Sequence, residues 1–178
     1  TLESEDAKPA AVLAYVDSVR EELLDPEDAS IRASEKGDKA ELAYCEVYRE
    51  YDQYLEEQDK LDFPRMVQMA VKALEHNAAN GGSYLRKFKH VLVDEFQDIN
   101  AAQKCMIDYF VSANSHLWAV GDDYQAIYGW RGSNVRYMLD FKNSYKDATV
   151  HALKVNYRSG RHILQAAENL SNHFLEGF

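Results

Sequence analysis

The sequence predicts an α/β protein in which a mainly helical N-terminal segment precedes a partial, largely parallel sheet. Apolar residues recur at helical intervals through residues 9–77, whereas short apolar runs that end in acids occur only after residue 89. Helical patterns separate these runs, which is typical of parallel strands joined by crossover helices. In such sheets the functional groups are expected at the carboxyl ends of the strands.

The first 80 residues are expected to be predominantly helical. The periodicity predicts three helices, at residues 9–24, 39–58 and 63–77. The stretch "DPEDAS" at 25–30 is interpreted as a break after the first helix, and Pro64 suits the first turn of the third. In the second helix Tyr48 and Tyr51 share an apolar face, which indicates packing and not a ligand site.

The second half alternates between the two kinds of pattern. Strands are predicted at 90–95, 117–123 and 149–159, and helices at 101–111 and 161–174. The first two strands both end in a pair of acids, in "HVLVDE" and "LWAVGDD". This repeated design favours a ligand site shared by neighbouring strand ends.

Composition and charge exclude several classes of protein. With 46% hydrophobic and 12% aromatic residues the chain is not a disordered one, and no apolar run reaches the roughly 18 residues of a membrane span. "TLESEDAKPA" is unlike a secretion signal, so a cytoplasmic location is expected, and Cys45 and Cys105 are expected to be reduced, partly buried thiols.

The formal charge of -10 is unevenly distributed along the chain. Residues 1–81 hold 9 Lys and Arg against 20 Asp and Glu, whereas residues 82–178 hold 11 against 10. The acidity therefore belongs to the N-terminal half. A near-neutral second half can carry a local phosphate-binding patch, so the global charge does not exclude DNA as a partner.

Asp94 and Glu95 follow an apolar strand directly, where at least one carboxylate should project into a crevice. Carboxylate oxygen is what Mg²⁺ prefers, and a second carboxylate can orient an attacking water. An isolated acid pair is more often a solvated turn or a helix N-cap. The longer pattern around it decides between these interpretations.

Three sequence words occur in one order: "VLVDEFQDIN" at 91–100, "VGDDYQAIYGWRG" at 120–132 and "NYRS" at 156–159. Together they resemble motifs II, III and IV of the UvrD/Rep/PcrA group of superfamily 1 DNA helicases, over roughly residues 61–178. The resemblance implies a partial RecA-like P-loop NTPase domain with a mainly helical N-terminal segment. It divides the chain into a helical insertion (1–60), the second half of the first RecA-like domain (61–146) and the start of the second (147–178).

The resemblance to motifs II and III implies roles for single residues. Asp94 would hold Mg²⁺, Glu95 would activate water for attack on the γ-phosphate of ATP, and Gln125 would sense that phosphate. The single-stranded DNA contacts would come from Tyr128, Trp130 and Arg131. The residue types agree, because an amide donates to phosphate oxygens and aromatic faces stack on any base.

The resemblance to motif IV implies that Arg158 acts as an arginine finger and that Tyr157 stacks on the adenine. Two positions depart from the family pattern: Tyr124 stands where Asp is usual, and Ala126 stands where Ser is usual. Neither is the implied metal ligand or sensor, so altered coupling is expected and not loss of activity.

No glycine in the 178 residues is followed by lysine, so the P-loop pattern GxxxxGK[ST] is absent. Motifs V and VI are absent too. The first hypothesis is therefore a fragment, inactive alone, of an ATP-dependent helicase that works on single-stranded DNA and duplex junctions in DNA repair or replication. The alternatives are a non-catalytic single-stranded DNA-binding module and the helicase subunit of a recombination nuclease.

Overall fold

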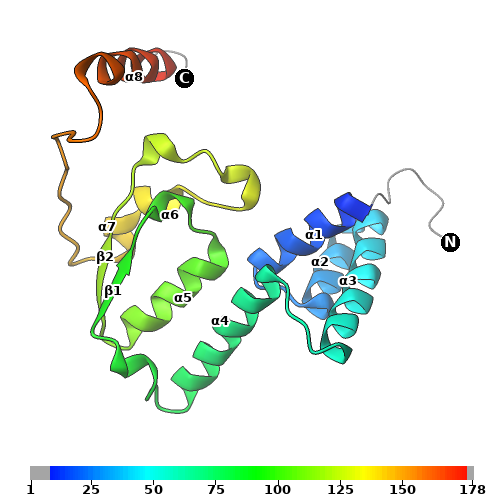
Figure 1. Cartoon of the computed structure of the whole chain (residues 1–178). Helices are drawn as coiled ribbons and strands as arrows, with labels where there is room; N and C mark the ends of the chain where they lie inside the picture. Colours follow the sequence, from blue (N-terminus) through cyan, green and yellow to red (C-terminus); the bar gives the residue numbers. More distant parts are fainter. Residues whose placement is uncertain (1–8, 176–178) are drawn as a thin grey trace. The chain divides into compact units, whose positions relative to one another are not determined.

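The computed structural model describes residues 9–175, and its N-terminal part is helical, as predicted (Figure 1). The helices are α1 (Pro9–Glu21), α2 (Pro26–Lys36), α3 (Lys39–Glu57) and α4 (Phe63–Ala79). The sequence prediction missed α2. The stretch at 25–30 does end α1, but Asp25 is also the N-cap of a new helix, because its Oδ1 accepts a hydrogen bond from the Asp28 N–H at 3.0 Å. Pro26 then occupies the first turn, which favours a helix start.

Aspartates also begin the next two helices. Asp38 accepts hydrogen bonds from two backbone N–H groups at the start of α3, and Asp62 accepts one from Arg65 at the start of α4. Each carboxylate satisfies an orphan donor and places negative charge at the positive end of the helix dipole. Part of the acidity of the N-terminal half therefore serves to start helices.

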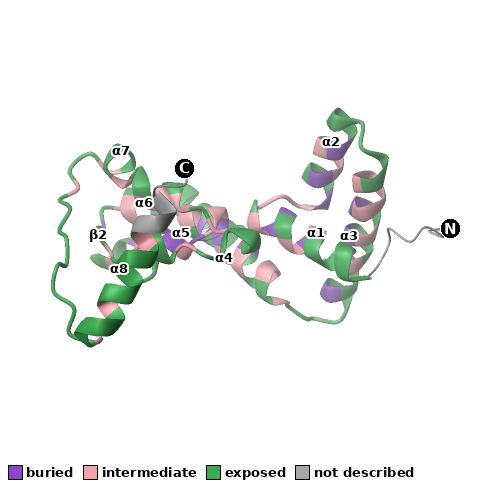
Figure 2. Ribbon diagram, turned by 90° about the horizontal axis from the view of Figure 1, so that it is seen from above, coloured by how far each residue is buried: buried purple, intermediate pink, exposed green. Residues whose placement is uncertain are grey.

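The N-terminal core lies where α1, α2 and α3 face one another (Figure 2). Its fully packed members are mostly small or aliphatic: Val16, Val19, Ala29, Ala33, Cys45 and Tyr48. Arg20 is 0% exposed beside this core, and its guanidinium donates to Asp52 at 2.7 Å and to Asp62. Because Asp62 also caps α4, this ion cluster connects α1, α3 and α4.

A two-stranded parallel sheet follows the helices. Strand β1 (His90–Val93) pairs with β2 (His116–Ala119), in a register that sets His90 opposite His116. Helix α5 (Ala101–Ser112) forms the crossover and begins with a capping box between Asn100 and Gln103. The α/β prediction is thus confirmed only in part, because the described residues are mostly helical and these two strands make up the sheet within residues 9–175.

The chain divides into two compact units between Met138 and Leu139. The short helix α6 (Arg136–Leu139) crosses this division, and the second unit contains α7 (Phe141–Ser144) and α8 (Arg161–Leu175). The strand predicted at 149–159 is wrong, because this segment is exposed and has no regular hydrogen bonding. A strand needs a neighbour for its backbone groups, and none of the described residues supplies one.

The free thiols match the prediction, with Cys45 buried and Cys105 half-buried. None of the helices in the described part of the chain is long and apolar enough to cross a membrane.

Candidate functional site

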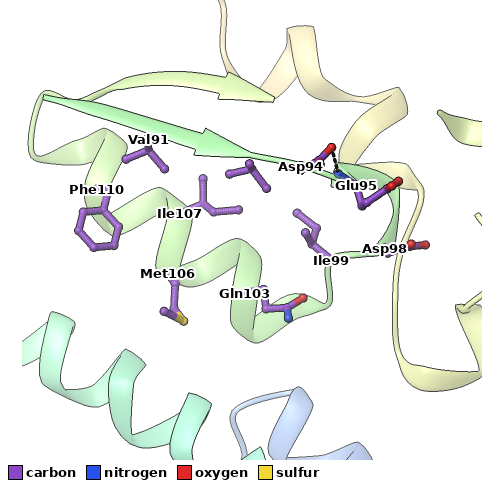
Figure 3. Close-up of a pocket in the computed structure, with 10 residues that line it drawn as sticks. Val91, Asp94, Glu95, Asp98, Ile99, Gln103, Met106, Ile107 and Phe110 are labelled. Atoms are coloured by element: carbon purple, nitrogen blue, oxygen red, sulfur yellow. Dashed lines mark hydrogen bonds between the residues drawn. The ribbon is translucent and has the colours of Figure 1, made fainter. Parts of the chain in front are cut away.

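Asp94 and Glu95 lie directly after β1, and both are exposed at its carboxyl end (Figure 3). The Asp94 Oδ1 atom accepts a hydrogen bond from the Glu95 N–H at 2.9 Å, which orients the carboxylate. Glu95 has a φ of 50°, in the left-handed region that residues other than glycine avoid by about 1–2 kcal/mol. Such strain persists where the surroundings impose it, and it is common at functional sites.

A pocket of about 420 Å³ extends from these acids along β1 and α5. Figure 3 shows carboxylates at one end and apolar side chains, including Val91, Ile107 and Phe110, at the other. Asp98 also lines the pocket, and its buried Oδ1 atom has no hydrogen-bond partner among the described residues. The pocket thus combines an apolar wall with a rim of oxygen acceptors.

The acidic turn after β2, which contains Asp122 and Asp123, lies beside the acidic turn after β1, which contains Asp94 and Glu95. The two turns meet because the parallel ladder continues beyond the strands. The Val120 N–H donates to the Val93 carbonyl at 2.9 Å, and the Phe96 N–H donates to the Val120 carbonyl at 2.9 Å. Gly121 follows at a close approach, where a Cβ atom would lie 2.6 Å from the Gln97 Oε1 atom. The absence of a side chain at position 121 therefore allows the two turns to meet.

Gln125 is held by the turn that carries it. Its Nε2 group donates to Asp122 Oδ2 at 2.8 Å, while Asp122 Oδ1 accepts from the Tyr124 N–H at 3.1 Å. Gln125 is exposed, so its side chain remains open to a ligand. Nothing in the structure explains why position 124 carries a tyrosine.

The predicted DNA contacts lie together on the far part of the same turn. Trp130 is 80% exposed and Tyr128 is also exposed, as expected from the glycines around them. The Arg131 guanidinium carbon lies 5.9 Å from the centre of the Tyr128 ring and 5.7 Å from that of Trp130. Two flat rings and a cation therefore form one exposed cluster, a combination that can stack on bases and contact phosphates.

This cluster borders a groove of about 810 Å³, whose other walls come from α1, the start of α4 and residues 98–103. Glu21, the last residue of α1, reaches the turn, because a Cβ atom on Gly132 would lie 2.1 Å from its Oε2 atom. Burial is the largest influence on the Glu21 carboxyl and raises its pKa, and the charge of Asp17 raises it as well. A hydrogen bond from Asn100 and the charge of Arg131 lower the pKa, but the net effect is a raised pKa. The helical segment thus contacts the start of α5 and the 120–132 turn through one carboxylate.

Tyr157 and Arg158 belong to the second unit. The Asn156 side chain shapes their turn, since its Oδ1 atom accepts from the N–H groups of Arg158 at 2.9 Å and Ser159 at 2.8 Å. Both side chains are exposed. The structure therefore brings together Asp94, Glu95 and the 120–132 turn in the first unit, whereas the NYRS pair lies on an exposed turn of the second unit.

The donors at the end of β1 fit a magnesium nucleotide better than a protein-caged metal. No group of three or more His, Cys, Asp or Glu side chains that could hold a metal occurs among the described residues. Mg²⁺ is usually bound by one or two carboxylates together with waters and phosphate oxygens. Asp94 suits that role, because one of its oxygens is oriented by the Glu95 N–H and a carboxylate has further acceptor positions.

Sequence reasoning missed two residues that contact the candidate site, Gln97 and Glu21. Gln97 belongs to the motif "DEFQD", so its position could have marked it as a candidate site residue. The sequence could not, however, predict its hydrogen bonds. Glu21 ends an ordinary amphipathic helix, and nothing in its own segment indicates a contact with residues more than 100 positions later.

A parallel β-α-β unit with acidic turns at both strand ends is typical of α/β proteins that act on nucleotides. The comparison with known sequences defines the group: the profile of the UvrD/REP helicase N-terminal domain matches residues 1–146, and the chain belongs to this family. The match includes the helical segment as well as both acidic turns.

The similar proteins are bacterial DNA helicases. The chain is 31% identical over 172 residues to the ATP-dependent DNA helicase PcrA of Staphylococcus epidermidis, covering 97% of this chain and 23% of that protein. It is 33% identical over 162 residues to PcrA of Bacillus subtilis, covering 91% and 22%. It is 34% identical over 169 residues to UvrD1 of Mycobacterium tuberculosis, again covering 91% and 22%. The chain therefore spans less than a quarter of the length of these relatives.

Proposed function

We propose that this chain works as part of an ATP-dependent DNA helicase or translocase, which couples ATP hydrolysis to movement on single-stranded DNA and to duplex unwinding. The observation that carries the proposal is the backbone pairing of Phe96 with Val120, which sets the two acidic turns side by side. Residues 61–146 then belong to a RecA-like ATPase domain, with a helical insertion at 1–60 and a second such domain from 147. A role in DNA repair or replication in the cytoplasm is part of the same proposal.

The nucleotide is bound at the carboxyl ends of β1 and β2. Asp94 holds Mg²⁺, which neutralises charge on the β- and γ-phosphates when it is bound. Glu95 accepts a proton from the attacking water, and Gln125 donates its amide N–H to the γ-phosphate. Because the backbones of Phe96 and Val120 pair, the two turns lie close enough for these side chains to face one ligand.

The far part of the same turn binds DNA. Tyr128 and Trp130 stack on bases of single-stranded DNA or of a duplex junction, and Arg131 contacts phosphate. Stacking is indifferent to base identity, which suits a motor that must move along any sequence. Because Gln125 and Trp130 lie on one turn, a change at the phosphate can reach the base contact.

The second unit contributes two residues to the proposed reaction. Tyr157 stacks on the adenine, and Arg158 stabilises the negative charge that develops during phosphoryl transfer. This pair supports the proposal only through its match to the family motif and through its exposure.

The decisive experiment replaces Glu95 by Gln in the complete encoded protein. Loss of the general base should reduce DNA-stimulated ATP hydrolysis by at least about 100-fold while ATP binding persists. Glu56→Gln, an exposed acid on α3, serves as the matched control and should leave turnover unchanged. Undiminished hydrolysis by Glu95→Gln would refute the assignment.

A second candidate is a single-stranded DNA-binding module that does not hydrolyse ATP. The presence of the whole aromatic cluster in the first unit favours it. ATP hydrolysis by the complete encoded protein distinguishes the two functions. If that protein binds single-stranded DNA but does not hydrolyse ATP, the DNA-binding module is the correct interpretation.

A further inference from the structure

Gln97 lies between the two acidic turns and is 1% exposed. Its Nε2 group donates to the Glu95 Oε2 atom at 2.7 Å, and its Oε1 atom accepts from the Asp122 N–H at 3.0 Å. One buried amide therefore joins the side chain of the proposed water activator to the backbone of the second turn.

The partners fix which way this amide points. A backbone N–H can only donate and an ionised carboxylate can only accept, so the amide oxygen must face Asp122 and the amide nitrogen must face Glu95. Reversing the amide would break both hydrogen bonds. The orientation of Gln97 thus follows from the chemistry of its neighbours.

The connection continues to the proposed phosphate sensor. Asp122, whose N–H is held by Gln97, accepts the Gln125 amide at 2.8 Å. Glu95 and Gln125 are therefore joined through two intervening residues by hydrogen bonds of 2.7–3.0 Å. The close approach of Gly121 to the Gln97 Oε1 atom leaves the amide little room to move aside.

The two hydrogen bonds of this amide have different consequences. The buried amide oxygen of Gln97 accepts from the Asp122 N–H. Without that partner the N–H group would destabilise the fold. The Nε2 group, however, is directed at the carboxylate of an exposed residue, which water could solvate equally well. That second hydrogen bond satisfies the buried Nε2 donor and also fixes the position of the Glu95 carboxylate.

We propose that Gln97 is a positioning residue, which fixes the Glu95 carboxylate relative to the Asp122–Gln125 turn so that water activation and phosphate sensing occur in one geometry. The inference rests on the proposed function, because it presupposes that Glu95 and Gln125 act on the same nucleotide. Gln97 itself touches neither ATP nor DNA.

The test compares Gln97→Glu with Gln97→Ala in the complete encoded protein. The glutamate has almost the same volume and keeps an acceptor for the Asp122 N–H, but it loses the donor and sets a like charge against Glu95. We expect kcat for DNA-stimulated ATP hydrolysis to fall by about 10- to 100-fold in both variants, with KM for ATP changed less than about 3-fold. A loss of global fold would instead lower the melting temperature and the ATP-binding capacity together.

Gln53→Glu is the matched control, because Gln53 also donates its Nε2 group to a glutamate, Glu57, at 2.8 Å on an exposed helix. Its turnover should equal that of the unaltered protein. A second readout uses the 178-residue chain: hydrogen exchange of the Asp122 N–H should accelerate in Gln97→Ala and stay slow in Gln97→Glu.

The outcomes separate this inference from the proposed function. If Glu95→Gln keeps its hydrolysis, or if the unaltered protein has none, the proposed function fails and the inference fails with it. If Glu95→Gln is inactive while Gln97→Glu matches the unaltered protein in kcat, only the inference is overturned. Unchanged Asp122 exchange in Gln97→Ala would also overturn it.

Discussion

Replacing Gly132 by Ala tests the contact between α1 and the turn that carries the aromatic cluster. Gly132 has a φ of 76°, a conformation that disfavours alanine by about 1–2 kcal/mol. The new Cβ atom would also lie 2.1 Å from the Glu21 Oε2 atom, so the glutamate must swing away and lose its hydrogen bond from Asn100. That loss adds about 1 kcal/mol, which gives a total destabilisation of about 2–3 kcal/mol.

A Glu21→Ala background isolates the contact. There only the backbone strain remains, so Gly132→Ala should destabilise by about 1–2 kcal/mol, and the coupling energy between the two sites is about 1 kcal/mol. Urea unfolding of the 178-residue chain followed by far-ultraviolet circular dichroism measures both values. Gly129→Ala is the control in the same turn, because Gly129 has no positive φ and a Cβ atom added there would meet no other atom within 4 Å. Equal destabilisation by Gly132→Ala in both backgrounds would refute the contact.

Three further predictions concern DNA binding, the buried ion cluster and pH. Trp130→Ala should weaken binding of single-stranded DNA by the complete encoded protein about 5- to 150-fold, since base stacking contributes about 1–3 kcal/mol; fluorescence anisotropy measures it. Arg20→Met should destabilise the chain by about 3 kcal/mol in urea unfolding, because it removes the buried cation that pairs with Asp52 and Asp62; their 27% and 21% exposure and their remaining contacts with Arg65 and Tyr51 limit the loss. Glu21→Gln should gain stability relative to the unaltered chain as the pH rises above 4.5, the ordinary pKa of Glu21.

The sign of the pH effect follows from the raised pKa of Glu21. Its contribution to stability is fully present below the ordinary pKa and is lost as the pH rises through the higher pKa of the folded state. A stability difference between the two chains that does not vary with pH would contradict it.

For Trp130, unchanged DNA affinity would contradict the stacking role. The control is Tyr54→Ala, which replaces an exposed tyrosine on α3. For Arg20, a loss below about 1 kcal/mol would mean that water already solvates the cluster.

Local patterns predicted the parts of this fold that depend on local physics. Helical periodicity indicated α1, α3, α4 and α5 because each buries one stripe, and apolar runs ending in acids indicated β1 and β2. The missed helix α2 is also local, since Asp25 and Pro26 form a standard helix start that was interpreted only as a break. The segment 149–159 was mistaken for a strand because β-branched content cannot reveal whether a neighbouring strand exists.

The candidate site was predictable only as a set of residue types. The motif words located Asp94, Glu95 and the 120–132 turn, but the contacts between them depend on the parallel register of the sheet. The hydrogen bond between Gln97 and Asp122 and the contact of Glu21 with the 120–132 turn arise from packing between segments far apart in the sequence. Such contacts leave no periodic trace in the chain, so one sequence cannot reveal them.

The left-handed backbone at Glu95 sets stability against the proposed chemistry at a single position. Glycine there would relieve about 1–2 kcal/mol of steric strain and forfeit about 0.5–1 kcal/mol through extra freedom of the unfolded chain. It would also remove the hydrogen bond from Gln97, so the net change in stability is close to zero. A laboratory evolution experiment that rewards only heat resistance should therefore accept glycine at position 95, whereas one that also rewards ATP turnover should retain the glutamate.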